Sequence, residues 1–100
     1  MLGYANGAMN TVVLVEIKNH LCERDIDQIK KLIDNFAFFH PEHQGKKVLC
    51  IVAYVDATEE ARDELTKMGI MLAHINDDVF QLVNPEGFMP RDFSKVPAVA

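Results

Sequence analysis

The sequence predicts a single α/β domain in which a mixed β-sheet is flanked by two helices. Two runs rich in β-branched residues, 11–18 (TVVLVEIK) and 48–55 (VLCIVAYV), are typical of strands, and the second, apolar on both faces, predicts a central strand covered on both sides. The segments that follow each run repeat their apolar residues at helical spacing, so strands and helices alternate along the chain. Alternation of this kind favours right-handed βαβ units. The order β, β, α, β, α, β, β therefore predicts an α/β sandwich around a mixed sheet.

Length and composition are those of one globular domain. One hundred residues allow a single core, and 49% hydrophobic with 25% charged residues exclude a mainly disordered chain. The net charge is −5, so a role on DNA needs a local basic patch or a metal ion to offset repulsion. No apolar run approaches the ~18 residues of a membrane span, and the N-terminus lacks signal-peptide features. We expect a cytoplasmic protein without a membrane partner.

The expected elements follow one another without a long linker. In chain order they are a short strand near 2–8 that forms a hairpin with 11–18, a helix at 25–39, a strand at 48–55, a helix between 58 and 69, strands at 70–75 and 79–83, and a surface tail at 84–100. Asn6-Gly7 favours the hairpin turn, and Pro41 ends the first helix. Thr58 is the expected N-cap of the second helix, and Gly69 its left-handed stop.

The strand at 11–18 ends with two charged residues on one face. Side chains alternate in a strand, so Glu16 and Lys18 share a face with Val12 and Leu14, while Ile17 belongs to the other face. Burying either charge without a partner or a function costs several kcal/mol. Two interpretations remain open, a chemical role or an ion pair at the edge of the sheet.

Glu16-Ile17-Lys18, in this order of segments, resembles the core of the PD-(D/E)XK nuclease superfamily. Five pieces carry the resemblance and together cover nearly the whole chain: GYANG (3–7), VVLVEIKN (12–19), DIDQIKKL (25–32), FAFFHPEHQGKK (36–47) and NPEGFMPRDF (84–93). They are similar to segments of an uncharacterised prokaryotic branch of that superfamily. The resemblance implies a restriction-endonuclease-like fold, truncated at the N-terminus because the superfamily's first helix has no counterpart here.

The resemblance also implies metal-dependent hydrolysis of phosphodiester bonds in DNA. Glu16 and the backbone carbonyl of Ile17 would be ligands of Mg²⁺, with Mn²⁺ as the alternative ion, because these cations take oxygen ligands. Lys18 would orient the nucleophile and stabilise charge developing on the phosphate. Gln28 matches a polar residue that related families aim at the site from the next helix. A capping role is favoured slightly, since Asp25-x-x-Gln28 is a capping-box variant.

Two departures from the family pattern bear on activity. Leu2 stands where an acidic residue normally supplies the second metal ligand, and divalent-ion sites depend on converging negative charge. We therefore expect an incomplete or degenerate endonuclease core, with a non-catalytic interaction or assembly module as the alternative. An unrelated α/β domain with a coincidental Glu-x-Lys fits the matched segments least well. The second departure, the missing helix, would leave apolar surface uncovered, so we expect a homo-oligomer.

Overall fold

A computed structural model describes residues 2–6, 11–39 and 46–94 of the chain. The elements are β1 (Leu2–Asn6), β2 (Thr11–Leu21), α1 (Asp25–Phe39), β3 (Lys47–Ala57), α2 (Glu59–Lys67), β4 (Met71–Asn76) and β5 (Val79–Leu82). Their order is the predicted one, and the fold is an α/β domain with a mixed sheet. The predicted turn at Asn6-Gly7 and the loop with Pro41 fall partly or wholly outside the described residues, as does the end of the tail.

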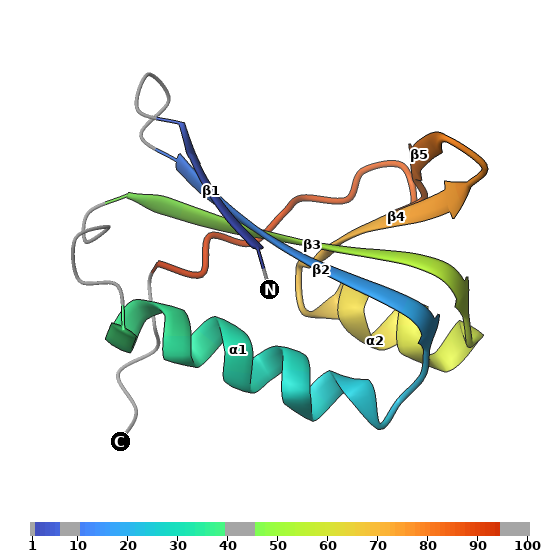
Figure 1. Ribbon diagram of the computed structural model, residues 1–100, viewed down its shortest axis with the longest axis horizontal. Coiled ribbons are helices and arrows are strands. Elements are labelled where there is room, and N and C mark those ends of the chain that lie inside the picture. The colour runs from blue at the N-terminus through green and yellow to red at the C-terminus, as the bar shows by residue number, and fades with distance from the viewer. Residues whose placement is uncertain (1, 7–10, 40–45, 95–100) are drawn as a thin grey trace.

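The sheet contains all five of these strands in chain order, β1-β2-β3-β4-β5. Neighbours among β2, β3 and β4 are parallel, whereas β1 and β5 are antiparallel to the strands they pair with. Both βαβ connections step across the sheet in the same direction. Because such crossovers are right-handed, the two helices must lie on the same face. Figure 1 shows α1 and α2 together on one side of the sheet.

One prediction about the sheet is wrong. The apolar run in β3 predicts a strand covered on both faces, but both helices pack on one face only. On the other face Ile17 of β2 is 53% exposed and Val55 of β3 is 48% exposed. The sequence of a strand shows that both of its faces are apolar. Which face a helix covers depends instead on the handedness of the connections between the strands.

The core lies between the two helices and the face of the sheet that they cover. Its buried residues come from β2, β3, β4, both helices and the connection before β4: Val12, Leu14, Leu21, Ile26, Ile29, Ile33, Val48, Cys50, Val52, Tyr54, Ala61, Leu65, Ile70 and Leu72. The apolar stripe of α1 predicted from its three- and four-residue spacing contributes Ile26, Ile29 and Ile33 to this core. Burial also raises the pKa of the Cys50 thiol to about 12, with a smaller contribution from the negative charge of Glu16. Cys50 therefore packs as a neutral side chain.

Local signals set the limits of α2. Thr58 adopts an extended conformation and its hydroxyl accepts a hydrogen bond from the Ala61 amide at 3.2 Å, so it is the N-cap, as predicted. Gly69 has a φ of +83°, the left-handed conformation expected of a helix stop. Neither helix among the described residues is long and apolar enough to span a membrane.

The segment after β5 extends along the amino ends of β4 and β3. The Asn84 side chain accepts a hydrogen bond from the Leu72 amide at 2.7 Å. The Arg91 amide then donates to the Gly69 carbonyl at 2.9 Å, and the Phe93 amide to the Val48 carbonyl at 2.8 Å. The part of the predicted surface tail that is described, 84–94, is therefore bonded to the sheet rather than merely lying over it.

Candidate functional site

The second half of β2, which continues to Leu21 instead of ending at Lys18 as predicted, presents Glu16 and Lys18 on the face covered by the helices. Leu14, two residues earlier on this face, is 1% exposed, whereas Ile17 points away from the helices. Glu16 pairs with Val52 of β3 and Lys18 with Tyr54, and both charged side chains are half-buried. The predicted alternation of faces is confirmed. Two charged groups therefore lie at the border between the apolar core and solvent.

Lys18 is held by two side chains from the first turn of α1. Its Nζ donates a hydrogen bond to Oε1 of Gln28 at 2.9 Å and lies 3.8 Å from Oδ1 of Asp25. The structure thus brings together two of the three side chains that the sequence marks for the site, Lys18 and Gln28. The capping interpretation of Gln28 is wrong, because the Asp25 amide donates to the Cys22 carbonyl at 3.0 Å instead.

Asp25 is a member of this cluster that sequence reasoning missed. One of its oxygens accepts a hydrogen bond from the Cys22 amide at 3.0 Å, and the other faces Lys18. The bond from the Cys22 backbone is the main cause that lowers the pKa of the Asp25 carboxyl, and the charge of Lys18 lowers it further. The available signal was the short connection 22–24, which returns the start of α1 to the end of β2.

Replacing Asp25 by alanine is expected to destabilise the fold by about 1 kcal/mol at neutral pH, because a hydrogen-bonded carboxylate at a helix start is lost. The pKa of Asp25 is lower in the folded state than in the unfolded state, where it is ~3.9. Its carboxylate therefore adds to the free energy of unfolding above the unfolded-state pKa, and this contribution is lost as the pH falls through the folded-state pKa. The difference in free energy of unfolding between wild type and Asp25→Ala, measured with urea, should therefore become smaller in acid. Asp27→Ala, an exposed position on the same turn, is the control. An equal difference at both pH values would contradict the assigned hydrogen bonds.

The predicted site has few ligands for a metal ion. Within 2–6, 11–39 and 46–94, no three His, Cys, Asp or Glu side chains lie close enough together to hold an ion. Mg²⁺ prefers several converging oxygen ligands, so Glu16 with the Ile17 carbonyl does not make a site for a resident ion. In the antiparallel ladder with β1, Leu2 pairs with Val15, the residue before Glu16. Paired residues share a face, so position 2 lies on the face of Val15 and not on that of Glu16, and an acid there would not converge with Glu16.

Further polar residues gather where the parallel strands end. Nδ1 of His20 and Oδ2 of Asp56 are 2.8 Å apart on β2 and β3, and both side chains are exposed. Neither belongs to a metal cluster among the described residues. The pair joins the carboxyl ends of the two strands next to the row that holds Lys18.

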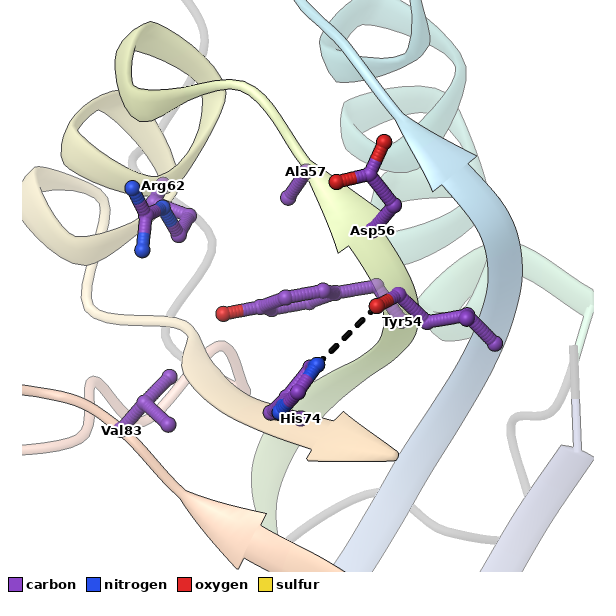
Figure 2. Close-up of a pocket in the computed structure, with 7 residues that line it drawn as sticks. Tyr54, Asp56, Ala57, Arg62, His74 and Val83 are labelled. Atoms are coloured by element: carbon purple, nitrogen blue, oxygen red, sulfur yellow. Dashed lines mark hydrogen bonds between the residues drawn. The ribbon is translucent and has the colours of Figure 1, made fainter. Parts of the chain in front are cut away.

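A cleft of about 330 Å³ opens at the ends of β3 and β4, beside α2. Figure 2 shows the Tyr54 hydroxyl extending into it, with Arg62 on one side and Val83 on the other. His74 lies against Tyr54, with ring centroids 5.6 Å apart, and its Nε2 is 3.0 Å from the Val55 carbonyl oxygen. Arg62 also borders a second cleft, which Glu59 and Asp63 line. These carboxylates offset its charge, so this edge offers little attraction for a phosphate.

Comparison with known proteins leaves the chain without a match. No protein-family profile matches it, and neither a curated protein nor a solved structure is significantly similar to it. The functional argument therefore depends on the residues and their geometry.

Proposed function

We propose that this chain is an incomplete core of a DNA endonuclease of the PD-(D/E)XK type. In this proposal Lys18 is the cation that faces the scissile phosphate, Gln28 positions Lys18, and Glu16 with the Ile17 carbonyl is what remains of the ligand set for Mg²⁺ or Mn²⁺. The ion would supply charge neutralisation and an activated water when bound. The donor set described above does not hold such an ion by itself.

The observation that carries the proposal is the contact between Lys18 Nζ and Gln28 Oε1 at 2.9 Å. A lysine at the border of an apolar core is costly unless its charge is satisfied, and here α1 supplies both an amide and a carboxylate for it. The amide orients the ammonium, while the Asp25 carboxylate at 3.8 Å offsets part of its charge. The arrangement is therefore suited to holding the ammonium in one fixed place, which is what a positioned lysine at a phosphate site requires.

The shortage of acidic ligands makes the core incomplete rather than active. Glu16 is the one carboxylate of the proposed ligand set, and the net charge of −5 opposes DNA binding without an ion. We expect the wild-type chain to bind Mg²⁺ no more tightly than millimolar, and to leave supercoiled and branched DNA intact.

Gly3→Asp is expected to restore part of what is lacking. Gly3 pairs with Leu14 and therefore lies on the face of Glu16, so one more carboxylate there should tighten Mg²⁺ and Mn²⁺ binding at least about tenfold in calorimetric titration. DNA cleavage should then appear, and Glu16→Gln or Lys18→Ala in the Gly3→Asp background should abolish it. Leu2→Asp, which adds the same charge one residue earlier but on the other face of the sheet, is the matched control and should do neither.

Two results would overturn this proposal. One is cleavage by the wild type that Glu16→Gln and Lys18→Ala leave unchanged. The other is a folded Gly3→Asp variant that neither binds the ions more tightly nor cleaves DNA.

A second candidate function is a non-catalytic interaction or assembly module that keeps the same fold. The observation that favours it is the apolar face of the sheet opposite the helices, where Ile17 is 53% and Val55 48% exposed. A binding partner retained by Glu16→Gln and Lys18→Ala would support this candidate.

A further inference from the structure

The face of the sheet opposite the helices is apolar from β2 to β5. We call it the open face; it consists of the odd-numbered residues of 11–17, 47–55 and 71–75, with Phe80 and Leu82 of β5. Large hydrophobic side chains protrude from it, with Phe80 63%, Leu82 64%, Ile17 53% and Val55 48% exposed. Apolar patches that extend over a whole sheet face are uncommon on monomers and mark interaction surfaces.

The open face is also almost free of charge. Apart from Thr11 and Lys47 at one end, every residue in the set just defined is apolar. The acidic excess of the chain, −5 in total, lies elsewhere on the surface or in the segments that flank it. A partner that supplied charged groups would leave them unpaired against this surface, which is costly. The face therefore fits a partner that is itself apolar and flat.

Its relief suits a copy of itself. One cross-strand row contains Ile17, Ala53, Ala73 and Leu82 in register, from β2 to β5. The two alanines at its centre are 1% and 3% exposed, while the ends of the row protrude. The larger side chains around these alanines close over them, so the centre of the row is low and closed. When two such faces meet about a two-fold axis, the protruding end of the row in one copy can pack against the low centre of the row in the other. Interfaces between identical copies require this kind of self-complementarity.

The size of the face suits a small dimer interface. The stretches that carry it are 11–17, 47–55, 71–75 and 80–82. At ~3.3 Å per residue and ~4.8 Å between strands, its projected area is roughly 400 Å². Side-chain relief raises the accessible area above that projection, toward the ~800 Å² per partner of a standard interface. Two sheets packed in this way lie ~10 Å apart, as in a β-sandwich.

We propose that the open face binds the open face of a second copy of this chain, forming a two-fold symmetric dimer whose centre is a sheet-on-sheet core. The inference does not rest on the proposed endonuclease function, because Glu16, Lys18 and Gln28 lie on the side of the sheet that the helices cover. The dimer would explain why a sheet with helices on one face keeps apolar residues on both.

Neighbouring residues of β5 provide a matched test by sedimentation velocity across the micromolar range. Phe80→Glu and Leu82→Glu place a carboxylate in the proposed interface and should weaken a micromolar dimer on the order of 100-fold. Val79→Glu changes a side chain that is 60% exposed and adjacent to Phe80, but on the other face of β5, and should leave dimerisation unchanged. Thermal unfolding of each variant shows that it is folded. Raising the salt concentration should tighten the dimer, since apolar burial drives it and like net charge opposes it.

Three results would overturn the proposal. A wild-type chain that is monomeric throughout the micromolar range has no such interface. Equal weakening by Val79→Glu and Phe80→Glu would indicate pairing through the edge of β5 instead of the open face. Dimers that survive both Phe80→Glu and Leu82→Glu would place the interface elsewhere. Because none of these measurements involves metal or DNA, they do not depend on the outcome of the cleavage experiments.

Discussion

Gly69→Ala is expected to lower the free energy of unfolding by about 2–4 kcal/mol, the sum of a strained backbone and a steric clash. Gly69 has a φ of +83°, which disfavours any residue with a Cβ atom. A Cβ at this position would also overlap the Cβ of Arg91 and come within 3.0 Å of its backbone nitrogen. Retreat of the Arg91 backbone would break its hydrogen bond to the Gly69 carbonyl. Urea unfolding followed by circular dichroism measures the effect.

Gly87→Ala separates the two contributions. Gly87 has a nearly identical φ of +85°, yet an added Cβ there would meet no atom within 4 Å. Its replacement should therefore cost only the backbone strain, about 1 kcal/mol. If Gly69→Ala cost no more than Gly87→Ala, the close approach of 84–94 to the end of α2 would not exist in solution.

Leu14→Ala is expected to destabilise the fold by about 3 kcal/mol, because it removes most of a fully buried side chain and leaves a cavity. Leu14 is 1% exposed and pairs with Cys50, which is also 1% exposed, beneath the helices. A loss of this size is a large fraction of the free energy of unfolding of a domain of this length. Thermal and urea unfolding should both record it.

Val13→Ala is the comparison, since Val13 is the preceding residue of β2 and lies on the open face. It is half-buried, and its truncation should cost about 1 kcal/mol or less at concentrations where the chain is monomeric. Equal costs at the two positions would mean that the helices do not cover the face to which Leu14 belongs.

Much of the candidate site followed from the sequence. The period of a strand, two residues, places Glu16 and Lys18 on one face, and the resemblance of its helix marks Gln28. Asp25 escapes such reasoning because it lies seven residues beyond Lys18, after a loop. The distance between its carboxylate and the Lys18 ammonium depends on how the connection 22–24 turns back, and no spacing rule reports that.

Interactions between residues close in the sequence determine where the strands and helices of this protein lie. The apolar period of α1, the cap at Thr58 and the left-handed stop at Gly69 each depend on residues within a few positions, so the order of strands and helices follows from reading the chain. Leu2 in place of an acid is likewise a property of the sequence.

Tertiary structure alone decided which surfaces are covered. Both crossovers step the same way and share one handedness, so α1 and α2 fall on the same face and leave Val55 and Phe80 exposed on the other. The same packing brings Gln28 and Asp25 to Lys18. These contacts join residues far apart in the chain, and their free energy depends on how the elements meet rather than on the propensity of any segment.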